Sequence, residues 1–176
     1  MIFKHIKVTV VAVLLFFAFM PNTANAQSKD FSLGAKLAYG TEIENIGIGI
    51  NAEFPIMEKL TISPSFIYYL PKDETFVKIN WFEVNANANY YFVQDEEFDF
   101  YGLAGLNYTN VSVKYDGPYA GLILGNTSDS DGRLGLNLGG GANWNLGGSI
   151  TPFAEVKYVI IDGGQLVLAA GIRFKI

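Results

Sequence analysis

The chain has 176 residues, enough for one domain with a sizeable core, and no shift in composition marks a second domain. Half of its residues are hydrophobic and only 16% are charged, against roughly 25% in an average globular protein, which excludes a disordered chain. The formal net charge of -5 offers no basic surface to a phosphate backbone, so we expect no nucleic-acid partner. The lack of cysteine excludes disulfides and a thiol nucleophile.

The N-terminal segment is typical of an exported protein. A basic start precedes an apolar run over 8–20, and a proline and the small-residue sequence "ANA" follow, ending at Ala26. The apolar run is shorter than the roughly 20 residues of a spanning helix, which favours cleavage over a retained membrane anchor. We therefore expect a signal peptide over 1–26 and a mature domain over 27–176, in which ten basic residues face seventeen acidic ones.

The mature chain shows the two-residue periodicity of β-strands. Apolar residues recur at every second position, and glycine, asparagine, β-branched and aromatic residues fill the runs. Eight such runs are found, at about 31–39, 44–54, 60–70, 80–93, 98–115, 134–146, 149–160 and 164–176. They predict an all-β fold, an eight-stranded antiparallel up-and-down barrel.

The connections between these runs alternate in length. Tight turns are predicted at 55–59, 94–97 and 147–148, and longer polar loops at 71–79 and 116–133. Short turns at one end and longer loops at the other are typical of bacterial transmembrane barrels. The connections 40–43 and 161–163 are short exceptions at the loop end.

The two faces of each predicted strand differ in size and polarity. In "NWFEVNANANYYFV" (80–93), one face carries a glutamate, three asparagines and a tyrosine, and the other carries valine, alanine and aromatic residues. In 134–146, leucines and a tryptophan alternate with glycines and asparagines. Eight strands enclose room only for side chains or one small ligand, so the bulky apolar face cannot fit inside. We predict that the polar face lines the lumen and that the apolar face contacts lipid, where a closed barrel leaves no backbone unpaired.

The same alternation predicts which charged residues point into the lumen. Three acids and four bases come close to cancelling there: Lys36, Glu53, Glu83, Glu155, Lys157, Arg173 and Lys175. Because an isolated charge in a lumen is costly, we expect them to form ion pairs. Two interpretations stay open, namely a structural plug that packs the lumen and a gate or ion path built on Glu83, Glu155 and Arg173.

Aromatic residues gather towards the ends of the predicted strands, which suits two girdles at the membrane interfaces. We expect Phe54, Phe92, Phe98, Trp144 and Phe174 near the short turns, and Tyr39, Tyr68, Trp81 and Tyr158 near the loops.

Motifs for catalysis or metal binding are incomplete. The loop "TSDSDG" (127–132) has the alternating acids of a calcium loop, but Leu138 stands where the bidentate glutamate should fall. The one histidine, His5, belongs to the signal peptide, which excludes a Ser-His-Asp triad and a histidine metal site. The glycine-rich run at 135–141 lacks the ending of a phosphate-binding loop. We therefore expect no catalytic residues, no metal, no cofactor and no enzymatic activity.

Several stretches resemble a known family. They are the signal peptide, "FYGLAGLNY" (100–108), "LGLNLGGGANWNL" (134–146) and the closing "LVLAAGIRFKI" (166–176). Together they resemble the small bacterial outer-membrane β-barrels of the OmpA, OmpX and OmpW type, also grouped as porin-family proteins. The resemblance covers the mature chain and implies a place in outer-membrane lipid and insertion by the barrel-assembly machinery.

Architecture alone does not fix the function of such barrels, which serve as adhesins, tethers, channels and assembly factors. We favour a largely plugged barrel with a structural or surface-interaction role and a possible surface ligand at the loop 116–133. The alternatives are a narrow small-solute channel and a soluble exported barrel that binds an apolar ligand inside, in the manner of a lipocalin.

Overall fold

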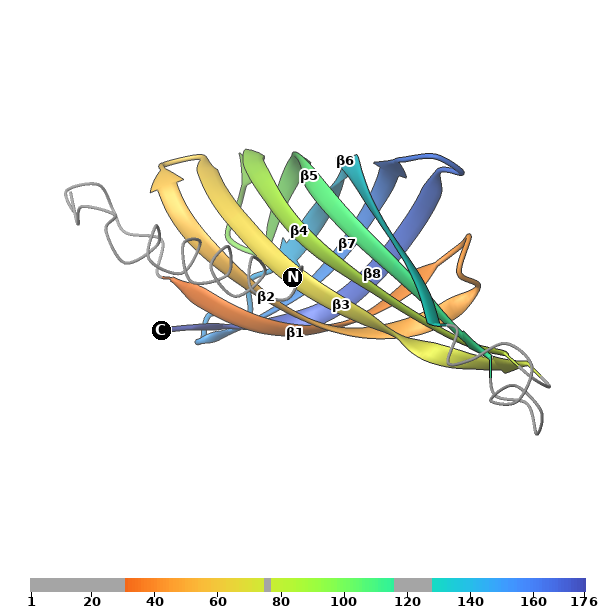
Figure 1. Cartoon of the computed structure of the whole chain (residues 1–176). Coiled ribbons are helices and arrows are strands. Elements are labelled where there is room, and N and C mark those ends of the chain that lie inside the picture. Colours follow the sequence, from red (N-terminus) through yellow and green to blue (C-terminus); the bar gives the residue numbers. More distant parts are fainter. Residues whose placement is uncertain (1–30, 75–76, 116–127) are drawn as a thin grey trace.

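The computed structural model describes residues 31–74, 77–115 and 128–176, without the side chains of 72–78 and 114–129. The strands are β1 (Ser32–Gly40), β2 (Asn45–Met57), β3 (Leu60–Glu74), β4 (Val77–Gln94), β5 (Phe98–Tyr115), β6 (Ser128–Trp144), β7 (Ile150–Ile160) and β8 (Gln165–Lys175). Each pairs with the next in antiparallel fashion and β8 pairs with β1, which closes the barrel (Figure 1). The eight-stranded barrel predicted from the sequence is confirmed. The predicted signal peptide lies outside the described residues.

In the described part of the chain, no helix is long and apolar enough to cross a membrane.

The two ends of the barrel differ in their connections. The turns 58–59, 95–97 and 145–149 are short, and we call this the short-turn end. The opposite end, here the hairpin end, carries two further short turns, 41–44 and 161–164, and the tips of the longest strands.

The prediction of long loops at 71–79 and 116–133 was partly wrong, because strands occupy parts of both ranges. Within 71–79, β3 continues to pair with β4, with Asp73 opposite Lys78. Within 116–133, β6 begins at Ser128, while 116–127 lies outside the described residues. Polar residues suggested loops, but a strand in water needs no apolar residues to keep its ladder of hydrogen bonds.

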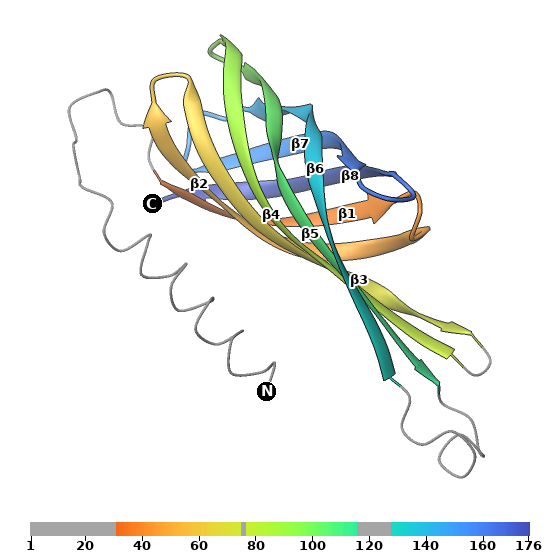
Figure 2. The ribbon, with the colours of Figure 1, turned by 45° about the horizontal axis from the view of Figure 1, so that its top comes forward.

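Strands β3 to β6 consequently extend past the rest of the barrel at the hairpin end. In the pairing of the described residues, β7 covers β6 only from Leu136 to Asn143, and β2 reaches along β3 only to Tyr69. Figure 2 shows the resulting four-stranded sheet projecting beyond the turns β1–β2 and β7–β8. We call it the extension, comprising 70–74, 77–82, 110–115 and 128–135.

The small polar face points inward, as predicted. Leu37 and Leu106 are 60% and 63% exposed on the outer surface, whereas Asn89 and Glu83 are fully buried inside. Exposed leucine, isoleucine, valine and aromatic side chains continue over all eight strands. Such a belt needs an apolar solvent, and a closed barrel suits lipid because every spanning strand is paired on both sides. The lipocalin-like alternative is wrong, since it requires the apolar face inside.

The aromatic residues expected near the strand ends are exposed on the outer surface, with two exceptions. Phe54 is half-buried against Phe31, with ring centroids 4.8 Å apart. Trp81 was wrongly placed, because it shares the inward face with Glu83 and lines a cavity instead. At the short-turn end, Phe98 stacks on Trp144 with centroids 6.0 Å apart, which forms part of the predicted girdle.

A cationic substitution should report the depth of the apolar belt. Leu37→Arg, near the middle of β1, should lower the free energy of unfolding by about 2–4 kcal/mol, and Leu146→Arg, beyond the end of β6, by about 0–1 kcal/mol. Reversible denaturant unfolding in lipid vesicles measures both. Equal effects at the two positions would contradict a lipid-facing belt.

Candidate functional site

Six of the seven charged residues expected in the lumen lie inside the barrel. Lys36, Glu53, Glu83, Lys157 and Arg173 are buried, and the side chain of Glu155 is 11% exposed. The set holds three acids and three bases, so its formal charge is zero. Lys175 is the exception: it ends β8 and is exposed at the short-turn end, because alternation fixes the face of a residue but not its depth.

The ion pairs nearest the short-turn end meet at Arg173. Its guanidinium contacts Glu53 Oε2 at 3.1 Å and Glu155 Oε1 at 3.0 Å. The hydroxyl of Tyr101 donates to Glu155 at 2.8 Å, and that of Tyr91 donates to Glu53. Both carboxylates therefore have a cation and a phenol as partners, which offsets the loss of their water.

Two further contacts hold the guanidinium in place. Arg173 Nη1 donates to Asn143 Oδ1 at 2.7 Å, and the guanidinium carbon lies 3.9 Å from the centre of the Phe153 ring. A planar guanidinium suits both a fork of acceptors and the face of a ring. We call Arg173 and these neighbours the Arg173 cluster.

A second cluster surrounds Glu83 on the side of the hairpin end. Its carboxylate pairs with Lys157 Nζ at 2.9 Å and accepts hydrogen bonds from Gln165 at 2.8 Å, Tyr69 at 3.0 Å and Asn107 at 3.3 Å. Four donors from β3, β5, β7 and β8 thus converge on one carboxylate of β4. We call this the Glu83 cluster.

The asparagine row of β4 extends the Glu83 cluster across the lumen. Asn85 Oδ1 accepts hydrogen bonds from Lys157 at 2.7 Å, Asn107 at 2.8 Å and Asn137 at 2.9 Å. Asn137 also donates to Asn87 at 2.7 Å. This row of asparagines therefore links β4, β5, β6 and β7 inside the barrel.

Glycines on neighbouring strands leave room for the long charged side chains. Lys36 lies between Gly49 and Gly171 in the register, Lys157 lies opposite Gly139, and Arg173 lies opposite Gly34. Each basic side chain can therefore cross the lumen past a glycine, where the neighbouring strand has no side chain in its way. This accounts for the glycine content of the inward face.

An apolar cluster, here called the cap, lies at the hairpin end of the lumen. It consists of the buried residues Ala38, Ile43, Ile67, Tyr69, Val159 and Val167. Trp81, Ile161 and Ala169 pack against it. The cap comes from the ends of β1 and β7, the middle of β3, the start of β8 and the turn 41–44.

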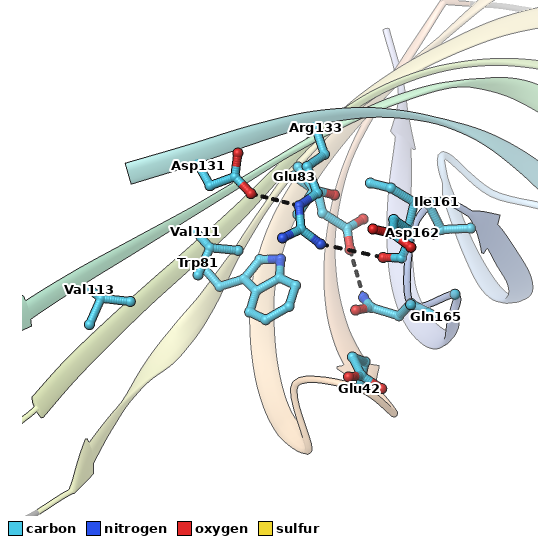
Figure 3. A pocket seen from close by; sticks show the side chains of 14 residues that line it. Glu42, Trp81, Glu83, Val111, Val113, Asp131, Arg133, Ile161, Asp162 and Gln165 are labelled. Atoms are coloured by element: carbon cyan, nitrogen blue, oxygen red, sulfur yellow. Dashed lines mark hydrogen bonds and ion pairs between the residues drawn. The ribbon is translucent and has the colours of Figure 1, made fainter. Parts of the chain in front are cut away.

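Two cavities lie at opposite ends of this filled lumen. The first, of 480 Å³, is at the hairpin end, with Glu83 in its floor and Trp81, Arg133 and Asp162 in its walls (Figure 3). The second, of 710 Å³, is at the short-turn end and is lined by Glu53, Arg173 and Lys175 among others. The paired charges and the cap separate the two.

The chemistry of these side chains is that of ion pairing and hydrogen bonding. In the residues that the structure describes, no group of three or more His, Cys, Asp or Glu could hold a metal ion. Two buried tyrosines, Tyr69 and Tyr101, were not predicted from the sequence as lumen residues, although their hydroxyls bind the lumen carboxylates. Their inward position in the alternation was the signal that could have found them.

A family model described as outer membrane protein beta-barrel domain matches residues 9–174. The chain belongs to this family. The protein is accordingly an integral β-barrel of the bacterial outer membrane, with membrane lipid around its apolar belt, as the sequence predicted.

Solved structures share the fold at low sequence identity. The N-terminal β-barrel domain of Pseudomonas aeruginosa OprF is 13% identical, with a TM-score of 0.64 over 85% of this chain and 98% of that one. Neisserial surface protein A is 18% identical, with a TM-score of 0.65 over 83% and 97%. The attachment invasion locus protein Ail of Yersinia pestis, in complex with the heparin analogue sucrose octasulfate, is 18% identical, with a TM-score of 0.57 over 82% and 97%. Among curated protein sequences, none matches the chain.

Removing the central cation should destabilise the barrel. Arg173→Leu leaves the carboxylates of Glu53 and Glu155 without their shared partner and should lower the free energy of unfolding by about 3–5 kcal/mol. Arg133→Leu breaks an exposed pair with Asp131 and should cost only about 0–1 kcal/mol. Denaturant unfolding in detergent measures both. Similar losses of unfolding free energy in the two variants would contradict a stabilising role of the buried lumen pairs.

A methyl group should distinguish the inward glycines from the outward ones. A Cβ at Gly171 would overlap the carbonyl oxygen of Ala35 and crowd Lys36, so Gly171→Ala should cost about 1–3 kcal/mol. Gly102→Ala, on an outer face with no atom within 4 Å, should be neutral or stabilising. Heat-dependent loss of the compact electrophoretic form compares the two, and equal midpoints would contradict the tight lumen packing.

Proposed function

We propose that this barrel is a non-conducting anchor that presents its extension to partners at the cell surface. The absence of conduction in this proposal rests on the lumen, where three acids pair with three bases and the apolar cap lies on the side of the hairpin end. Ions entering from either side would have to displace partners from buried charges and then pass apolar side chains, both of which are costly.

The extension supports the proposed contact with partners at the cell surface. Short turns lie on the periplasmic side in outer-membrane barrels, so the hairpin end faces outward. There residues 128–135 of β6 pair only with β5, and the residues of β3 beyond Tyr69 pair only with β4, so each strand has one free edge in the pairing of the described residues. Unpaired strand edges are templates for another extended segment. The segment 116–133, of which 116–127 lies outside the described residues, is the proposed contact for a surface ligand.

The charge of the hairpin end bears on the class of ligand. Ail is described with a sulfated sugar analogue. Here the outer cavity is lined by the acids Glu42, Asp131 and Asp162 and by one base, Arg133, in addition to Glu83. Because acids outnumber bases in this cavity, we do not propose a polyanionic ligand for this chain.

A narrow channel is the second candidate, because one observation favours it. Glu83 lines the outer cavity and Arg173 lines the inner one, so a charged cluster borders a cavity at each end of the lumen. A channel would need the pairs of Lys36, Lys157 and Arg173 to part.

Two further expectations belong to this proposal. The chain acts without catalysis, since its buried charges are engaged with one another. The barrel-assembly machinery inserts it, which the amphipathic β8, with Phe174 exposed on the outer face, supports.

Planar-bilayer recording separates anchor from channel. The wild-type chain should give no steady conductance, because the lumen pairs and the cap stay closed. Arg173→Gln should lower stability without opening a defined conductance. A steady wild-type current that this substitution alters would contradict the anchor and favour the channel.

Epitope insertion tests which end faces outward. A tag inserted at 75–76 should be labelled by antibody on intact cells, and a tag between Gly147 and Gly148 should be labelled only after the outer membrane is opened. The reverse labelling would overturn the orientation and with it the surface role of the extension.

A further inference from the structure

The inward side chains of β4 and β5 change from polar to apolar where these strands leave the barrel, and the outward ones become polar. Inside the barrel, their inward side chains are polar, as at Glu83 and Thr109. In the extension, the inward side chains are apolar and form the cross-strand pairs Trp81 with Val111 and Ile79 with Val113. The outward pair Asn80 with Ser112 is polar. In the extension, β4 and β5 thus turn a polar face away from the barrel axis and an apolar face towards the space above the lumen, where β6 adds the charged Asp131 and Arg133.

That apolar face forms one wall of the outer cavity. Trp81, Val111 and Val113 line it from the extension, and Val159 and Ile161 line it from β7 and the following turn. Its volume of 480 Å³ is within the range of about 300–1,000 Å³ found for small-molecule sites. Figure 3 shows Trp81 and Val111 on the side of the extension, with Glu42 and Asp162 on the side of the two short turns.

Carboxylates exceed bases in the same cavity. Glu83 is matched by Lys157 beneath it at 2.9 Å, and Asp131 is matched by Arg133 at 2.7 Å. Glu42 and Asp162 are exposed at the mouth. Because Arg133 Nη1 also donates to the backbone oxygen of Asp162 at 3.5 Å, the excess of two acids belongs to the cavity as a whole. A cation is favoured there over an anion, and the indole ring of Trp81 adds a surface to which cations are attracted.

We propose that the outer cavity binds a small organic cation with an apolar body, such as an arylalkyl ammonium. Its apolar part contacts Trp81, Val111 and Val113, and its ammonium group lies towards Glu42 and Asp162. This site goes beyond the surface anchor, because it needs no partner on the free strand edges and is unaffected if the lumen conducts.

The chain offers a reporter inside the cavity. It contains two tryptophans, and Trp144 is exposed on the outer face, where it stacks on Phe98. In the Trp144→Phe variant, Trp81 is therefore the single source of tryptophan fluorescence. The full mature chain is folded into nanodiscs and titrated with 3-phenylpropylammonium, with neutral 3-phenylpropanol and with anionic 3-phenylpropionate.

We expect a saturable change of Trp81 emission with the ammonium probe, about tenfold weaker binding of the alcohol, and no binding of the carboxylate. Raising the salt concentration should weaken the ammonium probe only, because the carboxylates at the mouth are exposed. Equal binding of the three probes, or no saturable response to the ammonium, would overturn the proposal without needing any further variant.

Charge removal locates the site. Glu42→Gln with Asp162→Asn should weaken the ammonium probe about fivefold or more. Glu58→Gln with Glu96→Gln removes the same charge at the short-turn end and should leave binding unchanged. Compact migration of unboiled samples checks that both variants fold. Unchanged binding in the first variant would overturn the site.

The test also distinguishes another occupant. If Trp81 responds to the ammonium probe only after residues 119–124 are deleted, the chain's own segment fills the cavity and the proposal is wrong. The surface role of the extension is read out separately by antibody labelling, so either proposal can fail alone.

Discussion

An eight-stranded barrel leaves room inside only for side chains, and every charge placed there loses most of its water. This chain meets that constraint with equal numbers of acids and bases, each held by a partner from another strand. Arg173 serves two carboxylates at once, and Glu83 collects donors from four strands. Some of these contacts cross the barrel, such as Glu83 with Lys157 and Arg173 with Glu53, and they join strands far apart in the sequence.

The glycines follow from the same constraint. A lysine or arginine that lies across a narrow lumen needs a neighbour without a side chain, and the register supplies one at Gly171, Gly139 and Gly34. The outer face has no such limit, so bulky leucines and isoleucines gather there. Composition and architecture are thus linked through volume: small and polar residues lie inside, and large apolar residues lie outside in lipid.

Alternation along the sequence predicted the number of strands, their closure and the face of each charged residue. It could not predict which charges meet, because register depends on contacts between distant strands. Lys175 shows the limit: its face was assigned correctly by alternation, yet it lies past the end of the lumen. The loops 71–79 and 116–133 show another. Their polar residues suggested irregular structure, yet β3 and β4 pair as far as Glu74 and Val77, and β6 begins at Ser128.

The exchange of faces in β4 and β5 reflects a change of surroundings along one strand. Inside the membrane, the outer face contacts lipid and the inner face a crowded polar lumen. Beyond the rim, the outer face contacts water, and the inner face bounds a cavity open to small molecules. A single rule of apolar outside and polar inside therefore holds only for the membrane-spanning part.

The most direct test of this account uses the outer face of β5 and the absence of cysteine from the chain. A nitroxide is attached to single cysteines at Leu106, Tyr108, Asn110 and Ser112 in lipid bilayers, and its collisions with oxygen and with a water-soluble nickel chelate are measured. Collisions with oxygen should dominate at Leu106 and collisions with the chelate at Asn110 and Ser112, with the change near Tyr108. A label at Leu106 that meets the chelate freely, or a label at Ser112 that stays in lipid, would contradict it.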